Sequence, residues 1–220
     1  MKKSVYSLVL SDSLINKIDH ISYLSGKSRS NLVNEILAEY LSYSTPEKKI
    51  TDIFENLENL ISEFDAFKMI NQPSTNMFSV KSALKYKYNP TVKYSVELFK
   101  EIEDFIGKLK VNFRTQSIDF IDYLRDFFIF WSYLEDKYIS NIPDICISRS
   151  AENGRFIRFL HLPLDEKHRT NEYIGKAIGE YINIFDSVLN LYFSNINNLY
   201  AAKTEAEKLY KNYVRNGIII

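Results

Sequence analysis

The sequence predicts an α+β protein with a small N-terminal module and a larger, helix-rich C-terminal domain that contains β-hairpins. Residues 1–45 combine one short run of β-forming residues with two stretches of helical apolar spacing. The rest of the chain alternates between hairpin-like and long helical patterns. Of its 220 residues, 45% are hydrophobic, and this composition favours an ordered core over disorder.

The first forty residues predict the order strand, helix, tight turn, helix. Val5–Leu10 is rich in β-forming residues and ends at Ser11-Asp12, which are helix-capping residues. Gly26 is typical of the residue that ends a helix, and Ser28 is typical of one that caps the next. The apolar positions at helical spacing are Leu14, Ile15, Ile18, Ile21 and Leu24, then Leu32, Val33, Ile36, Leu37, Tyr40 and Leu41.

Such a module cannot be stable alone. About 40 residues bury too little surface to offset the entropy lost on folding. The single strand also needs a neighbour for its backbone N–H and C=O groups. Pairing with the same strand of a second copy answers both needs, so we expect a two-fold dimer with an antiparallel ribbon.

This order of elements resembles the ribbon-helix-helix family of bacterial DNA-binding regulators. The resemblance lies within residues 1–43 and needs no gap. Its most specific part is the turn Gly26-Lys27-Ser28-Arg29-Ser30 together with the apolar spacing that follows it.

The resemblance implies an intertwined homodimer that binds double-stranded DNA with its β-ribbon in the major groove. The start of the second helix would bind a phosphate, because free N–H groups and the helix dipole favour an anion there. The implied base-facing residues are Lys3, Val5, Ser7 and Val9, and the implied phosphate-binding residues are Lys27, Ser28, Arg29 and Ser30. The implied dimer core comprises Tyr6, Leu8, Leu10, Leu14, Ile18, Ile21, Val33, Ile36, Leu37 and Tyr40.

The outward strand face departs from the family, which usually carries Arg, Lys, Gln, Asn or Thr there. This chain has Val5, Ser7 and Val9, and valine can at best touch a thymine methyl group. Two interpretations stay open: T-rich, modestly selective binding with affinity from backbone contacts, or a module that dimerises without reading DNA. Asn34, where the family commonly has a basic residue, favours weak binding.

Beyond residue 45 we expect a connector and amphipathic helix over 46–72, then an α+β sensing or oligomerisation domain over 73–220. The amphipathic helix carries apolar residues from Ile53 to Ile70, which suit a dimer mate, the C-terminal domain or an ordinary core. The predicted strands are Ser82–Tyr88 with Thr91–Leu98, and Ile145–Ser148 with Arg155–Leu162 through a turn at Asn153-Gly154. The predicted helices are Glu101–Leu109, Ile118–Tyr138, and Thr170–Asn216 as one helix or two.

An internal repeat is a second interpretation of residues 93–130. Lys93–Leu98 and the segment after it echo the first module and allow a degenerate second ribbon-helix-helix, but the alignment needs a one-residue slip and puts Asp119 where Leu32 sits. We rank a separate α+β domain above it.

No enzyme motif stands out. The chain has six glycines and no Gly-rich phosphate loop, nucleophile elbow or paired-carboxylate motif, so we expect no enzyme and no cofactor. Cys146 is the only cysteine, which excludes an internal disulfide framework. Its spacing from His161 and His168 does not support a metal site, and His20 is expected to be solvated.

A basic and aromatic segment leaves two interpretations open. It is either a second nucleic-acid face or a hairpin with one solvated lysine face and one buried aromatic face. Its residues are Lys85, Lys87, Lys93, Lys108, Lys110 and Arg114, interleaved with Tyr86, Tyr88, Tyr94 and Phe113. The aromatic richness equally suits a ligand pocket or an oligomer interface.

The formal net charge of zero means that any nucleic-acid binding must come from a local basic surface. Our leading hypothesis is a sequence-specific transcriptional regulator, most simply a repressor, that acts as a homodimer or a higher oligomer on DNA. The alternative is a plasmid or phage DNA-organising protein, for partition or transfer, whose C-terminal domain recruits a partner protein. An enzyme with a DNA-targeting head ranks third. We expect no signal peptide, no membrane span, and a cytoplasmic, nucleoid-associated location.

Overall fold

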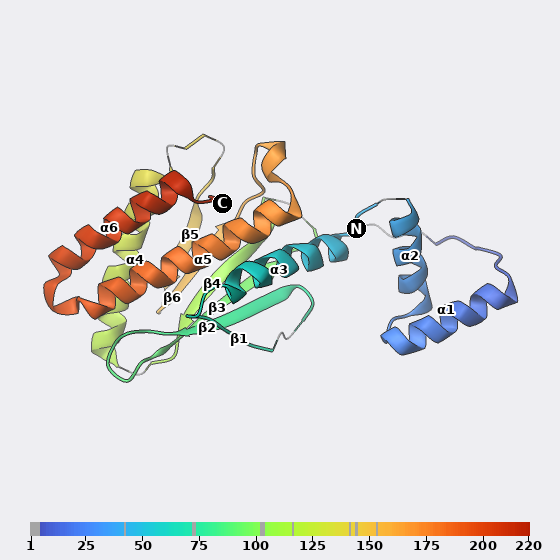
Figure 1. Cartoon of the computed structure of the whole chain (residues 1–220), viewed down its shortest axis with the longest axis horizontal. Coiled ribbons are helices and arrows are strands. Elements are labelled where there is room, and N and C mark those ends of the chain that lie inside the picture. The colour runs from blue at the N-terminus through green and yellow to red at the C-terminus, as the bar shows by residue number, and fades with distance from the viewer. Residues whose placement is uncertain are drawn as a thin grey trace. The chain divides into compact units, whose positions relative to one another are not determined.

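The computed structural model describes residues 5–41, 43–71, 74–101, 104–115, 117–140, 142–143, 145–152 and 154–220. The chain divides into two compact units, Met1–Lys49 and Ile50–Ile220. Figure 1 shows the elements of both units.

The first unit contains two helices, α1 (Asp12–Ser25) and α2 (Arg29–Tyr40). Gly26 ends α1 with φ +64°, a left-handed conformation that glycine adopts without steric cost. The Ser28 hydroxyl accepts a hydrogen bond from the N–H of Asn31 at 3.3 Å and so caps α2. The predicted starts of both helices and the predicted stop at Gly26 are therefore confirmed.

The second unit is built on a sheet whose described strands are all antiparallel, in the order β1-β2-β3-β4-β6-β5. The strands are β1 (Lys68–Met69), β2 (Met77–Ala83), β3 (Thr91–Leu98), β4 (Gly107–Phe113), β5 (Ser148–Glu152) and β6 (Arg155–Leu160). The α+β class is as predicted, and so is the pairing of the second hairpin, β5 with β6. Its bounds differ, because β5 begins at Ser148, the last residue of the strand expected over Ile145–Ser148, and β6 ends at Leu160. Asn153 of the predicted turn lies outside the described residues.

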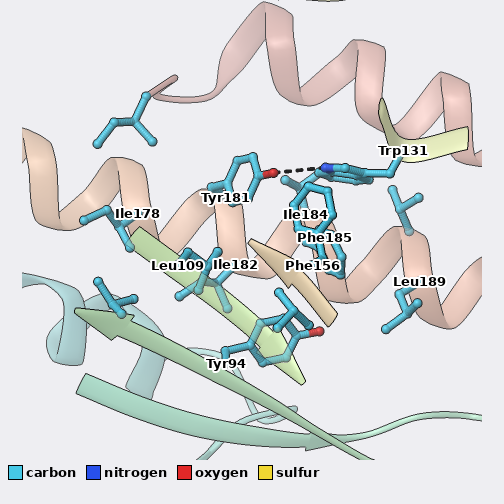
Figure 2. Close-up of a cluster of buried hydrophobic side chains, with 14 of the residues drawn as sticks. Tyr94, Leu109, Trp131, Phe156, Ile178, Tyr181, Ile182, Ile184, Phe185 and Leu189 are labelled. Carbon is cyan, nitrogen blue, oxygen red and sulfur yellow. Dashed lines mark hydrogen bonds between the residues drawn. The ribbon is translucent and has the colours of Figure 1, made fainter. Parts of the chain in front are cut away.

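The helices of this unit pack on one face of the sheet, as Figure 1 shows. They are α3 (Pro46–Ser62), α4 (Ile118–Tyr138), α5 (Asn171–Ser194) and α6 (Leu199–Asn216), with short 3-10 turns η1 (Glu166–His168) and η2 (Ile196–Asn198). Figure 2 shows Tyr94, Leu109 and Phe156 of the sheet directed toward α5. The rings of Tyr94 and Phe156 lie 6.1 and 5.3 Å from that of Phe185. The core therefore sits between the sheet and the helices.

Buried polar groups connect the helices to the sheet. Trp131 Nε1 donates to the Tyr181 hydroxyl at 3.0 Å, which donates in turn to Glu135 Oε1 at 2.9 Å (Figure 2 draws the first of these bonds). The same carboxylate lies 3.1 Å from Nε of Arg158, whose side chain is 1% exposed. Arg149 lies 3.5 Å from the other carboxylate oxygen. Each charge of this buried pair thus faces an opposite charge inside the protein, although burial still raises the pKa of Glu135.

The helix expected over Glu101–Leu109 is wrong, because Gly107–Phe113 is strand β4. Leu109 and Val111 point into the core, and Lys108 and Lys110 to the opposite face. A side-chain atom on Gly107 would lie 2.3 Å from the backbone oxygen of Glu97, so neighbouring strands approach closely there. This strand also rules out a second ribbon-helix-helix over residues 93–130, which needs a helix between Lys93–Leu98 and α4.

The first hairpin is correct in its pairing but not in its bounds. Strand β2 ends at Ala83, so Tyr86 and Tyr88 lie in the turn and not in the strand expected over Ser82–Tyr88. Pro90 has no N–H to continue the ladder, and its carbonyl accepts the Leu84 N–H at 2.9 Å. Tyr88 and Asn89 then take positive φ values of 63° and 44°.

The amphipathic helix is shorter and begins earlier than expected. Helix α3 starts at Pro46, inside the expected connector, because Thr45 Oγ1 accepts the Lys48 N–H and proline suits a first helical position. It ends at Ser62, so Phe64, Phe67 and Ile70 lie beyond it. Its apolar face belongs to the core of the second unit through Ile50, Ile53, Leu57 and Ile61. The segment Thr170–Asn216, expected as one helix or two, forms two helices, α5 and α6.

Within the described segments, no helix is both long enough and apolar enough to cross a membrane.

Candidate nucleic-acid interface

The segment that was expected to form the ribbon has no regular secondary structure between residues 5 and 11. Val5, Ser7 and Val9, the expected base-facing residues, are exposed, and Lys3 lies outside the described residues. Tyr6 and Leu8, expected to face inward, are also exposed, at 83% and 62%. The single chain offers this segment no neighbouring strand, and an isolated strand leaves its backbone groups unpaired. The strand itself therefore stays a prediction.

Most of the expected dimer core is exposed on α1 and α2. Ile18 is buried at 8% exposure, as is Leu32 on the second helix. By contrast, a set of large apolar side chains is between 44% and 86% exposed: Leu14, Ile21, Ile36, Leu37 and Tyr40. Leu10 and Val33 are partly exposed. A small unit with this much apolar surface in contact with water is suited to be covered by a partner.

The expected phosphate site lies at the start of α2. The first N–H groups of a helix have no partner inside the helix, so those of Arg29 and Ser30 face outward from its N-terminal end. The Ser28 hydroxyl oxygen accepts a hydrogen bond from the Asn31 N–H. The structure thus brings Lys27, Ser28, Arg29 and Ser30 together at one helix end, as expected.

Two carboxylates at this helix end were missed by the sequence interpretation. Lys27 Nζ lies 2.7 Å from Glu35 Oε2, and the Arg29 guanidinium binds both oxygens of Asp19 through Nε and Nη2. Neither pair has regular sequence spacing: Arg29 of α2 reaches Asp19 of α1 across the turn, and Lys27, in the turn itself, reaches Glu35 of α2. The only sequence signal for these ion pairs is the presence of acidic residues on the helix faces that flank the turn. The two cations are therefore partly neutralised before any ligand arrives.

The histidines and the cysteine are not grouped for metal binding. His20 is exposed on α1. His161, His168 and Cys146 line one cavity of about 290 Å³, where His161 Nε2 lies 3.1 Å from the Ser148 hydroxyl. Burial and the charge of nearby Arg158 lower the pKa of His161. In the part of the chain that the structure describes, no three His, Cys, Asp or Glu side chains are placed to hold a metal ion.

The basic and aromatic segment is split between the two faces of the sheet. Tyr94 is fully buried, whereas Lys93, its neighbour in β3, is exposed on the opposite face. Lys108 and Lys110 lie 3.1 and 3.3 Å from Glu97. Lys85, Lys87 and Arg114 are exposed at the strand ends, Tyr88 is fully exposed in the turn, and Tyr86 and Phe113 are half-buried. The solvated lysine face and the buried aromatic face are thus both present.

Comparison with known proteins gives no family. No family model matches the chain, and neither a curated protein nor a solved structure matches it. The ribbon-helix-helix resemblance therefore depends on the residues of the first unit.

Proposed function

We propose that this chain is a double-stranded DNA-binding transcriptional regulator, most simply a repressor, that dimerises through residues 1–43. The observation that supports the proposal is the exposed apolar surface of the first unit. Its large exposed side chains, such as Leu14, Ile36, Leu37 and Tyr40, occupy the positions that the family resemblance assigns to the dimer core. A second copy is an occupant that covers these positions and also gives residues 5–10 a strand to pair with.

In the proposed dimer, two copies of Val5–Leu10 pair antiparallel, and Val5, Ser7 and Val9 enter the major groove. Of these three side chains only Ser7 has a hydrogen-bonding group, and Lys3 extends the same row, so base selection depends on Lys3, on Ser7 and on valine contacts with thymine methyl groups. Affinity then comes mainly from phosphate contacts at the start of α2.

Arg29 can serve such a contact while it keeps its bond to Asp19. A guanidinium has five N–H donors; Nη2 donates one of them to Asp19 Oδ2, and Nε forms an ion pair with Oδ1. Among the described residues, Nη1 has no hydrogen-bond partner, so it can donate to a phosphate oxygen. Asp19 thus orients the arginine and at the same time offsets part of its positive charge.

The test uses two tyrosines with equal exposure. Tyr40 on α2 and Tyr200 on α6 are each 86% exposed, but only Tyr40 belongs to the proposed dimer core. Full-length Tyr40→Ser and Tyr200→Ser proteins are compared by sedimentation equilibrium and by retardation of duplexes selected from a random pool. We expect Tyr40→Ser to weaken both self-association and DNA binding, and Tyr200→Ser to change neither.

Equal behaviour of the two variants, or a wild-type chain that is monomeric at micromolar concentration, would rule out the proposed dimer. If the protein dimerises but retards no duplex at low salt, the proposed dimer stands and the proposed DNA-binding function is refuted. Footprints of the wild-type protein on genomic DNA then separate a promoter-bound repressor from an organiser, which protects an array of sites.

A further inference from the structure

The sheet of the second unit has one face without helices. Residues that point to the other face, such as Phe78, Tyr94, Leu109 and Phe156, form the core under the helices. Figure 1 shows these helices on one side of the sheet. The strand register assigns the side chains of this open face, which include the buried Ser79 and Ser95 at its centre and exposed residues around them.

A row of cations crosses this open face. The register pairs Lys68 with Lys81, Lys81 with Lys93, Lys93 with Asn112, and Asn112 with Arg155. Directly opposite residues of neighbouring strands point to the same face, so Lys68, Lys81, Lys93 and Arg155 form one line, here called the basic row. Four strand spacings of roughly 4.8 Å separate its ends, which makes the row about 19 Å long.

The lysines of the basic row are not neutralised within the protein, whereas Arg155, at its end, lies directly opposite Glu152 of β5 on the same face. All four of its cations are exposed, and none makes an ion pair with another residue in the described ranges. Like charges placed directly opposite each other destabilise a sheet. Four residues farther along β3 from Lys93 the situation differs, because Glu97 lies 3.1 Å from Lys108 and 3.3 Å from Lys110. The sheet thus compensates lysines in one place and leaves three adjacent lysines uncompensated in another.

The shape of the surface selects the kind of anion. The four cations are exposed and lie on four different strands, so they do not converge on one point as a site for a small anion requires. Separate charges in a line about 19 Å long match a linear polyanion. The positions along the row carry no aromatic side chain, and proteins that hold unpaired bases stack them on aromatic rings. The bases of a duplex are already stacked on each other, so a duplex can be bound through its phosphate charges alone.

We propose that the basic row binds the phosphate backbone of duplex DNA, as a second contact separate from the module at residues 1–43. The choice of DNA over another polyanion rests on the proposed function of that module. The contact is independent of base sequence, because lysine side chains on a flat face meet phosphates and do not enter a groove. It adds affinity and salt dependence to a first module whose own cations are partly paired.

The experiment compares two triple substitutions in the full-length protein. The row variant is Lys68→Gln, Lys81→Gln and Lys93→Gln. The matched control is Lys167→Gln, Lys208→Gln and Lys211→Gln, which removes the same charge from exposed positions on η1 and α6. Dissociation constants for a duplex that carries the selected site and flanking DNA are measured as a function of salt concentration. Urea unfolding followed by the fluorescence of buried Trp131 verifies that both variants fold.

Each phosphate contact contributes about 0.9 to the slope of log K against log salt, so three lost contacts lower the slope by up to about 2.7. We expect this loss in the row variant, by the same amount on specific and unrelated duplexes, and an unchanged slope in the control. Equal slopes in the two variants would overturn the proposal.

The same titrations separate the two proposals. Preference of the wild-type protein for its selected site over unrelated DNA reports on the N-terminal module, whereas the difference between the two triple variants reports on the basic row. If the wild-type protein prefers its selected site but the two triple variants have equal slopes, only the proposal for the basic row is refuted. If the slopes differ but the wild-type protein shows no site preference, only the proposed site-specific function is refuted. Sedimentation with vesicles of equal parts phosphatidylcholine and phosphatidylserine is run in parallel. If the row variant loses vesicle binding and keeps its DNA slope, the face binds membranes and the DNA contact is wrong.

Discussion

Removal of the negative charge of Glu135 should strongly destabilise the second unit. Its carboxylate is fully buried and lies 3.1 Å from Nε of Arg158, which is itself 1% exposed. Glu135→Gln keeps the size and the bond from Tyr181 but removes the negative charge. Arg158 then remains buried without a counter-charge, which typically costs 3–5 kcal/mol, roughly.

The surroundings of Arg158 place the expected cost at the lower end of that range. Its guanidinium also donates to the carbonyl oxygens of Ile220 at 3.0 Å, Phe159 at 3.3 Å and Cys146 at 3.4 Å, and these dipoles stay in place after the substitution. We therefore expect a loss of about 3 kcal/mol. With an m-value of about 2 kcal/mol/M, the urea midpoint falls by about 1.5 M.

The single tryptophan makes the assay specific for this unit. Trp131 is fully buried and belongs to the hydrogen-bonded chain that leads through Tyr181 to Glu135. Its fluorescence therefore follows the unfolding of the sheet and its helices. The control is Glu172→Gln, the same chemical change at an exposed pair, where Glu172 Oε1 lies 2.7 Å from Lys176 Nζ.

The control should leave the midpoint unchanged, because water screens that pair. If Glu135→Gln and Glu172→Gln shift the midpoint equally, the carboxylate of Glu135 is not the counter-charge of Arg158. The account of the buried pair would then be refuted.

Three further changes test other parts of the second unit by the same urea assay. Burial raises the pKa of Asp186, so the folded protein holds this proton to higher pH than the unfolded chain does. Wild-type stability should accordingly fall relative to Asp186→Asn as pH rises from about 4 toward the raised pKa, and a constant gap would contradict this. Gly175→Ala should lower the midpoint although alanine favours helix, because the added carbon would lie 2.6 Å from the Ile53 backbone oxygen of α3; an unchanged midpoint would show that the two helices can separate without cost. Lys81→Glu should raise the free energy of unfolding at low salt by about 0.2–1 kcal/mol for each of its two new cross-strand pairs, with Lys68 and Lys93, and so raise the midpoint; it should also weaken duplex binding. Loss of stability instead would mean that the lysines do not repel each other across the strands.

Local chemistry made the helices of the first unit predictable. The cap at Ser28 and the left-handed stop at Gly26 depend on residues within one turn of the chain, and both are where the sequence predicts them. Helix α4 matches its predicted bounds for a related reason, because Ser117 caps it and apolar residues continue at helical spacing to Tyr138. The strand over Val5–Leu10 differs in kind, since its partner is expected on another molecule.

Strand β4 shows where local patterns fail. Leu109 and Val111 alternate with lysines, as a strand requires, but the expected helix began at Glu101 and included the first half of this alternation. A short apolar run is ambiguous between helix and strand by periodicity alone. The choice is made by β3 and β6, which lie on either side and satisfy the backbone of β4. That information is distant in sequence.

The basic row could not be predicted for the same reason. Lys93 was singled out, but its companions Lys68, Lys81 and Arg155 lie in three other strands, far apart in the chain. Sequence alone grouped Lys93 with Lys108 and Lys110, which face Glu97 instead. Register decides which lysines are neighbours, and a shift of one residue would send a strand's side chains to the other face.

The zero net charge of the chain constrains when the basic row can act. A protein without net charge has little long-range attraction for DNA, and at 0.1 M salt the field of exposed lysines is screened within about 10 Å. The row therefore does not draw DNA from a distance and becomes effective only after another contact has brought the duplex near. The proposed ribbon dimer is such a contact. It follows that removal of the row lysines should speed dissociation of the complex far more than it slows association, and that the ribbon, not the row, sets which DNA is bound.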